Sequence, residues 1–189
     1  MIHRPARGKM KDNCMIWHDG EFFMYSMYSK TDATPDPADH SNYRCIRLAT
    51  SRDGVHWKDE GNIFEVPEGS GRQVWSNAVH RADDRFVLNY ASYEGGPVCD
   101  RLRTLRSDDL RDWTPQGEEY DIVSPAGLDG TRERIDSVNV FRRDGTYYGY
   151  GTGRHSFVTS KDGLRWTAEA PIEERVDWGD ILPPPRSTG

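Results

Sequence analysis

The sequence predicts an all-β protein made of many short strands, and three observations support this fold class. The 189 residues include nine Tyr, six Trp, six Phe and 18 Gly, which are residue types of strands and turns. Apolar residues at the spacing of an amphipathic helix are hard to find along the chain. A phrase also recurs: SRDGVHW (51–57) returns as SDDLRDW (107–113) and as SKDGLRW (160–166). A phrase that returns at this interval indicates a structural unit copied along the chain.

Each copy of the phrase closes a unit of three or four short strands. A strand-like run and a tight turn open the unit, and an aromatic strand follows in EFFMYSMYS (21–29), RFVLNYASY (85–93) and TYYGYGTGR (146–154). Asp19-Gly20 and Asp144-Gly145 are residue pairs that tolerate positive φ in a hairpin turn. One such sheet cannot bury both of its faces. We therefore expect the units to pack around an axis as blades of a β-propeller.

The Ser, Asp and Gly residues of the repeated phrase are interpreted as turn residues. Ser and Asp side chains can accept hydrogen bonds from nearby backbone amides, and Gly tolerates a positive φ. Each turn then delivers a Trp to the start of the outermost strand of its unit. We assign these residues no catalytic role.

The predicted blades cover about residues 10–62, 74–120 and 134–172 of one incomplete propeller domain, 1–189. A fourth segment begins at 173–189, where three consecutive prolines (183–185) cannot continue a central strand. Propellers close with four to eight blades, so about three blades leave sheet faces open. We favour a chain that is part of a longer protein; self-association through the open blade faces is the alternative.

Polar residues near the start of each unit are the candidate site residues, because the first strand of a propeller blade lines the central channel: Asp12, the Ser76-Asn77 pair and Asp136. The candidates share a spacing from the next aromatic strand: Asp12 lies ten residues before Phe22, Ser76 ten before Phe86, and Asp136 eleven before Tyr147. Treated as equivalent, these positions bring Asp12 and Asp136 to one axial pocket. The alternative is that each Asp caps a turn or pairs with a neighbouring Arg such as Arg134.

Three stretches resemble the five-bladed propeller glycoside hydrolases, especially family 43 and also family 32. DNCMIWHDGEFFMYS (12–26) is similar to the opening blade of family 43, in which an Asp stands seven residues before an Asp-Gly turn. VWSNAV (74–79) is similar to a Trp-Ser-Gly phrase of family 32. RIDSVNVFRRDGTYYGYG (134–151) looks like the third-blade Asp phrase of both families. Asn13 and Ser137 replace the Pro that usually follows each Asp.

The resemblance implies a glycoside hydrolase acting on an arabinoside, xyloside or fructoside. Asp12 would be the general base of an inverting enzyme or the nucleophile of a retaining one. Asp136 would orient substrate hydroxyls and adjust the pKa of the general acid. Substrate contacts are expected from three further side chains: Trp75, Asn77 and Arg134. For Trp75 and Asn77, packing between blades is the alternative.

The family's general acid is a Glu on a fourth blade, and the spacing of the first strands puts that position beyond residue 189. Glu169 is a poor substitute, because it follows Trp166 by three residues at the outer-strand exit of its blade. The chain alone is therefore expected to have little or no hydrolytic activity. A non-catalytic carbohydrate-binding propeller and a structural or interaction module are the alternative functions.

The expected partner is a small-molecule or oligosaccharide substrate, besides the self-association through open blade faces considered above. The net charge is −6 without a Lys/Arg block, which argues against nucleic acid, and no apolar run is long enough for a membrane span. No cofactor is expected, and the six His show no paired metal spacing. Cys14, Cys45 and Cys99 are interpreted as reduced thiols of a cytoplasmic protein, since no signal peptide is recognised.

Overall fold

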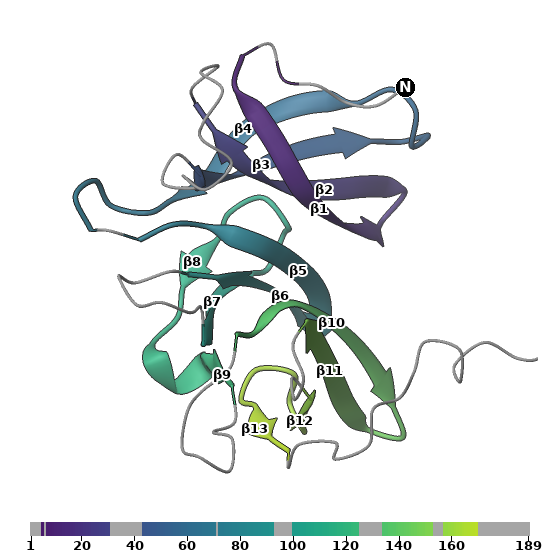
Figure 1. The fold of residues 1–189 in the computed structure, drawn as a ribbon. Coiled ribbons are helices and arrows are strands. Elements are labelled where there is room, and N and C mark those ends of the chain that lie inside the picture. Colours follow the sequence, from purple (N-terminus) through teal and green to yellow (C-terminus); the bar gives the residue numbers. More distant parts are fainter. Residues whose placement is uncertain are drawn as a thin grey trace, which may run out of the picture.

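Nearly all of the regular structure is β-strand, arranged in three antiparallel sheets that follow one another along the chain (Figure 1). The computed structural model describes residues 5, 7–30, 43–70, 72–92, 100–124, 134–152 and 157–169, with the backbone alone for Asp136, Ser137 and Thr152. Within these ranges the one helical element is the short 3-10 turn η1 (Glu118–Tyr120). The all-β fold class is confirmed.

Each sheet is a meander in which strands that are consecutive in the sequence are paired. The first sheet contains β1 (Lys9–His18), β2 (Glu21–Ser29), β3 (Tyr43–Ser51) and β4 (Lys58–Glu65). The second contains β5 (Trp75–Ala82), β6 (Arg85–Ala91), β7 (Arg101–Ser107) and β8 (Thr114–Pro115), and β9 (Ile122–Val123) also pairs with β7. The third contains β10 (Asp136–Arg143), β11 (Thr146–Thr152), β12 (Phe157–Ser160) and β13 (Thr167–Ala168). The predicted fourth segment, 173–189, lies outside the described residues.

The hairpin between the first two strands of each sheet turns on an Asp in the left-handed region. Asp19 has φ 47°, Asp83 has φ 50° and Asp144 has φ 49°. Asp tolerates this conformation better than most residues. The turns predicted at 19–20 and 144–145 are therefore confirmed, and the second sheet uses Asp83-Asp84 in the same place.

The repeated phrase forms the same hydrogen-bonded turn in all three sheets. In the first copy, the Ser51 hydroxyl accepts from the backbone N–H of Gly54 at 2.9 Å. The Asp53 carboxylate accepts from the N–H groups of Val55 and His56, both at 2.8 Å. The second and third copies repeat these contacts through Ser107 with Asp109 and through Ser160 with Asp162. The interpretation as turn chemistry is confirmed.

Adjacent sheets are joined at the tip of this turn. In the second sheet, the backbone oxygen of Leu110 accepts a 2.7 Å hydrogen bond from the Tyr25 hydroxyl of the first sheet. In the third sheet, the backbone oxygen of Gly163 is 2.9 Å from His80 Nε2 of the second sheet. The second and third sheets thus each place this turn on the preceding sheet.

The first strand of each sheet lies toward the middle of the molecule. β5 packs against β1 on one side and β10 on the other, so the second sheet lies between the first and the third (Figure 1). One hydrophobic core fills the space between the first two sheets, and a second draws on all three. Members of the first core include Phe23, Tyr25, Leu48, Leu88 and Leu110. This arrangement brings residues from three sheets to one central place.

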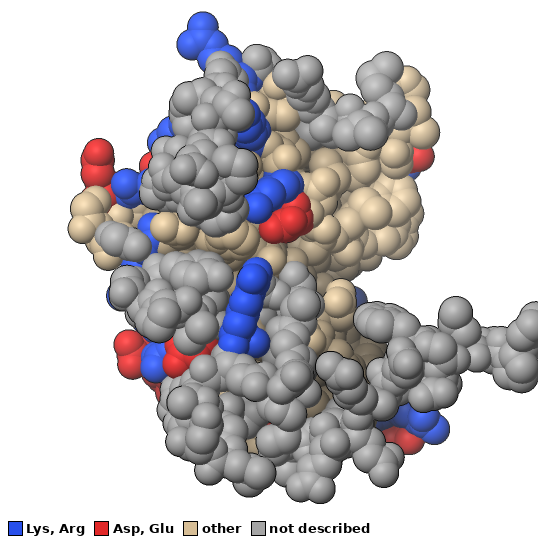
Figure 2. Space-filling model, viewed as in Figure 1, with Lys and Arg blue, Asp and Glu red and all other residues tan. Residues whose placement is uncertain are grey.

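Charged side chains connect the sheets at the surface. Arg111 of the second sheet pairs with Glu21 at 2.8 Å and with Glu60 at 3.3 Å, both in the first sheet. On the face shown in Figure 2, Lys and Arg side chains and Asp and Glu side chains of the described residues occur in small groups of both signs. Among the described residues, no helix is long and apolar enough to cross a membrane.

Candidate functional site

A β-bulge occurs at the same place in the first strand of all three sheets. The pairs on either side of it are Lys11–Met27 and Cys14–Tyr25 in the first sheet, Trp75–Ala91 and Asn77–Tyr90 in the second, and Asp136–Thr152 and Asn139–Tyr150 in the third. In each case the inner strand holds one residue more than its partner strand. Bulges re-aim side chains and are frequent next to functional sites.

Two bulge residues have a backbone conformation that is unusual for a residue with a side chain. Asp12 has φ 51° and Ser76 has φ 31°. A non-glycine residue in this region costs of order 1–3 kcal/mol, less for Asp than for Ser, and the surrounding structure has to offset that cost. The two residues occupy the same position in their sheets, seven residues before the turn Asp at 19 or 83.

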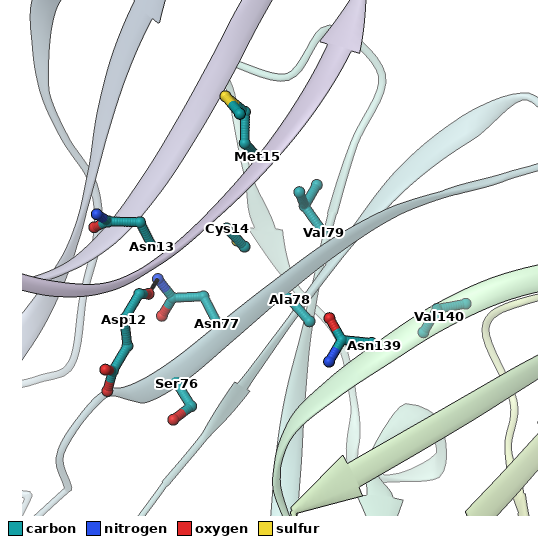
Figure 3. Close-up of a pocket in the computed structure, with 10 residues that line it drawn as sticks. All are labelled: Asp12, Asn13, Cys14, Met15, Ser76, Asn77, Ala78, Val79, Asn139 and Val140. Carbon is teal, nitrogen blue, oxygen red and sulfur yellow. Dashed lines mark hydrogen bonds between the residues drawn. The ribbon is translucent and has the colours of Figure 1, made fainter. Parts of the chain in front are cut away.

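The bulges surround a cavity of roughly 520 Å³ at the junction of β1, β5 and β10 (Figure 3). Its lining comes from these three first strands: Asp12, Asn13, Cys14 and Met15; Ser76, Asn77, Ala78 and Val79; Asn139 and Val140. Figure 3 shows Asp12, Ser76 and Asn77 grouped together, with Asn139 reaching in from β10. Asp12 is the one carboxylate among the described residues that line this cavity. The structure thus places Asp12 and Asn77 beside the same cavity.

Asn77 connects two of the strands and leaves one polar atom without a partner. Its Nδ2 donates a 3.4 Å hydrogen bond to the backbone oxygen of Asp12 across the boundary between the first and second sheets. Its Oδ1 is buried and accepts no hydrogen bond within the described part of the chain. A buried acceptor of this kind calls for a partner, and a ligand hydroxyl in the cavity is one candidate.

Trp75 lies in the core between the sheets. Its side chain is 8% exposed and belongs to the second hydrophobic core. Lys11 Nζ lies 4.4 Å from the centroid of its ring, and Arg134 Cζ lies 5.8 Å from it. Trp75 and Arg134 are not among the residues that line the cavity, so their positions favour packing over direct sugar contact.

Asp136 does not occupy the position that Asp12 occupies. The pairing puts Asp136 level with Lys11 and Trp75, one residue earlier, and Ser137 takes the place of Asp12 in the third sheet. The strict equivalence expected from the sequence is therefore wrong by one residue. The sequence spacing could have revealed this difference, because Asp12 precedes its turn Asp by seven residues and Asp136 precedes its turn Asp by eight. The Asp136 side chain lies outside the described residues.

Other reactive groups near the cavity are held in unreactive forms. Cys14 lines the cavity, but burial raises the pKa of its thiol to about 12, so it stays protonated at neutral pH. Burial also raises the pKa of the Tyr43 hydroxyl, and the nearby negative charge of Asp12 raises it further. Within the described ranges, no group of three His, Cys, Asp or Glu side chains is placed to hold a metal ion.

Glu169 directly follows β13, the outermost strand of the third sheet, which is the position expected from the sequence. Its carboxylate accepts a hydrogen bond from the Thr159 hydroxyl, as the Glu60 carboxylate accepts one from Thr50 in the first sheet. Glu60 and Glu169 therefore occupy matching positions, Glu60 in β4 and Glu169 directly after β13. Cys99, a further residue singled out from the sequence, lies outside the described residues.

Comparison with known proteins identifies the fold. No protein-family model matches the chain, and neither does any curated protein. Solved structures do match it. One is a family 117 glycoside hydrolase of the marine bacterium Zobellia galactanivorans, with a TM-score of 0.69 at 20% identity over 84% of this chain. The chain has the propeller fold of glycoside hydrolases.

Two further solved structures support this assignment. A protein of the GH130 family of mannoside phosphorylases, which contains glycoside hydrolases that target β-1,2 mannosidic linkages in Candida mannan, matches with a TM-score of 0.65 at 19% identity over 87% of this chain. A family 43 β-xylosidase/α-arabinofuranosidase from a compost microbial metagenome, solved with xylotriose, matches with a TM-score of 0.60 at 19% identity over 78% of this chain. The chain spans 54%, 50% and 43% of the three matched structures, about half of their length.

Proposed function

We propose that this propeller binds a saccharide in the cavity at the junction of β1, β5 and β10, and that it is a glycoside hydrolase-like protein. The observation that carries the proposal is the position of Asp12, whose carboxylate stands on a strained bulge beside that cavity. The amide of Asn77 and the side chain of Asn139 add hydrogen-bonding groups from the other two sheets. Several hydrogen-bonding groups around one carboxylate suit a ligand rich in hydroxyls.

Asp12 has the chemistry that glycoside cleavage requires of one of its two acids. An exposed carboxylate can take a proton from water as a general base, or attack the anomeric carbon as a nucleophile. Cleavage also needs a second acid to protonate the leaving oxygen. The described residues that line the cavity supply no second carboxylate. Hydrolysis by this chain alone is therefore expected to be weak or absent.

Activity is tested with aryl glycosides as substrates. The panel contains arabinofuranoside, xyloside, fructoside and mannoside, because solved proteins of this fold act on saccharides of these kinds or the sequence resembles enzymes that do. We expect no turnover above that of the Asp12→Asn variant for the 189-residue chain. Turnover that is lost in Asp12→Asn would show that the chain already contains a complete acid pair.

Saccharide binding without chemistry is the second candidate function. The Asn77 Oδ1 without a partner favours it, because a ligand hydroxyl that donates to this oxygen would contribute to binding whether or not the bond is cleaved. A glycan array followed by titration calorimetry would identify the ligand. If Asn77→Ala and Asp12→Asn weaken binding and no products form during long incubation, the chain is a binder. Products from the wild-type chain would instead make it an enzyme.

A further inference from the structure

The first and third sheets each expose a face that is covered in the other sheets. Two large hydrophobic side chains of the third sheet are exposed, Phe141 at 48% and Tyr150 at 46%. Their rings are stacked 5.8 Å apart, and Tyr148 and Phe157 extend the stack. We call these four residues the forward face of the third sheet. An exposed apolar patch of this kind marks an interaction surface.

Strand pairing gives each forward-face residue a counterpart in the first sheet. The pair Phe141–Tyr148 of the third sheet corresponds to the pair Ile16–Phe23 of the first sheet. The pair Tyr150–Phe157 corresponds in the same way to Tyr25–Leu48. In the first sheet the counterparts Phe23, Tyr25 and Leu48 are buried in the core that the second sheet covers. The forward face of the third sheet is therefore the surface on which a following sheet would pack.

The first sheet exposes the opposite face, which we call its backward face: Met15, Trp17, Phe22 and Val55. Met15 and Trp17 are each 53% exposed and Val55 is 48% exposed. The Trp17 and Phe22 rings lie 4.4 Å apart. Phe22 matches Phe86 and Tyr147 in the pairing, since each follows the hairpin turn of its sheet by the same distance.

The counterparts of Phe22 are covered by the preceding sheet. Phe86 is 4% exposed and lies 4.9 Å from the His18 ring of the first sheet. Tyr147 is 2% exposed, and its hydroxyl accepts a hydrogen bond from the backbone N–H of Asp83 in the second sheet. The backward face of the first sheet is thus built to lie on the forward face of another sheet.

We propose that the forward face of the third sheet binds the backward face of the first sheet in a second copy of this chain. The contact would continue the interface that the chain forms twice within itself, between its first and second and between its second and third sheets. Aromatic side chains are prominent on both exposed faces, and aromatic residues and Met are enriched in the cores of protein interfaces. If the forward face of each copy binds the backward face of the other, two copies close a ring of six sheets. Six sheets is within the range of known propellers. Asp12 would then be present twice along one channel.

Sedimentation equilibrium or light scattering across a range of concentrations tests the proposal, with the 21.7 kDa chain mass as reference. We expect assemblies of two or more chains for the wild type. Phe141→Glu and Trp17→Glu are each expected to weaken association at least about tenfold, because each buries a charge in the contact. Thr114→Glu adds the same charge to an exposed position of β8, on neither face, and is expected to leave the mass unchanged.

Mixing the two variants tests the head-to-tail direction. Phe141→Glu keeps an intact backward face and Trp17→Glu keeps an intact forward face, so the mixture can form one wild-type contact. We expect a one-to-one heterodimer from the mixture when each variant alone is monomeric. Circular dichroism spectra like that of the wild type would show that the variants are folded. A monomeric wild type, a mass that neither Glu variant changes, or a mixture that does not associate would each overturn the proposal.

Discussion

The Tyr25 hydroxyl donates a 2.7 Å hydrogen bond to the backbone oxygen of Leu110, and 85 positions separate the two residues. Both residues are fully buried, so the bond joins the first and second sheets inside their shared core. His80 and Gly163 form the corresponding contact between the second and third sheets. These contacts set how the sheets are placed around the cavity.

Removal of the Tyr25 hydroxyl is expected to weaken the packing of the first two sheets. Tyr25→Phe leaves the Leu110 oxygen buried without its donor, which costs about 1–2 kcal/mol in the free energy of unfolding. Urea denaturation measures this change. Tyr120→Phe is the matched control, because its hydroxyl accepts from the exposed Arg165 side chain and should contribute less than about 0.5 kcal/mol. Equal effects of the two changes would contradict the role given to the Tyr25 hydrogen bond.

Two glycines at the same position of the repeated turn are expected to respond differently to alanine. Gly54 and Gly163 both have φ 72°, so each Ala variant costs roughly 1 kcal/mol in backbone strain. A Cβ at position 163 would lie 2.9 Å from Ala82 Cβ and 3.1 Å from the Tyr147 ring, whereas at position 54 the nearest atom is 3.5 Å away. Overpacking should bring the loss for Gly163→Ala to about 2–4 kcal/mol in thermal or urea unfolding. A Gly54→Ala variant as unstable as Gly163→Ala would argue against close packing of the third turn on the second sheet.

The buried histidine of the second sheet is expected to make stability depend on pH. Burial lowers the pKa of His80 from 6.5 to about 4, against the opposing effect of its contact with the Gly163 oxygen. The unfolded chain therefore binds this proton more readily, so the His80 contribution is complete above pH 6.5 and is lost as the pH falls toward 4. His80→Asn should be less stable than the wild type at pH 7 and should lose less stability between pH 6.5 and 4. Parallel pH profiles of the two proteins would contradict a neutral, buried His80.

Local features of the fold could be predicted from the sequence because their causes are local. The repeated turn depends on Ser51, Asp53 and Gly54 and their own backbone, so the phrase alone shows it. The hairpin turn at Asp19-Gly20 is visible for the same reason. The sequence also indicated that Asp12 lies near the centre of the molecule, because the first strand of each blade was expected to line the central channel.

Features that depend on pairing between distant residues could not be predicted in the same way. The bulge at Asp12 is defined by its partner strand, so the sequence of the first strand alone does not show it. Trp75 was expected to contact substrate, but the packing of three sheets buries its ring in the second hydrophobic core, with Lys11 and Arg134 nearby. The hydrogen bond between Asn77 and the Asp12 backbone joins residues 65 positions apart, and only the arrangement of the sheets reveals it.

Calorimetric titration of the wild type, Asn77→Ala and Asp12→Asn with the saccharide selected by a glycan array tests the candidate site most directly. Glu68→Gln, an exposed position between the first two sheets, is the control. We expect Asn77→Ala to weaken binding at least about tenfold, since it removes both the oxygen and the nitrogen of the side-chain amide. Glu68→Gln should bind like the wild type. Undiminished affinity in both cavity variants, or a wild type that binds no saccharide of the array, would contradict a saccharide site at the junction of β1, β5 and β10.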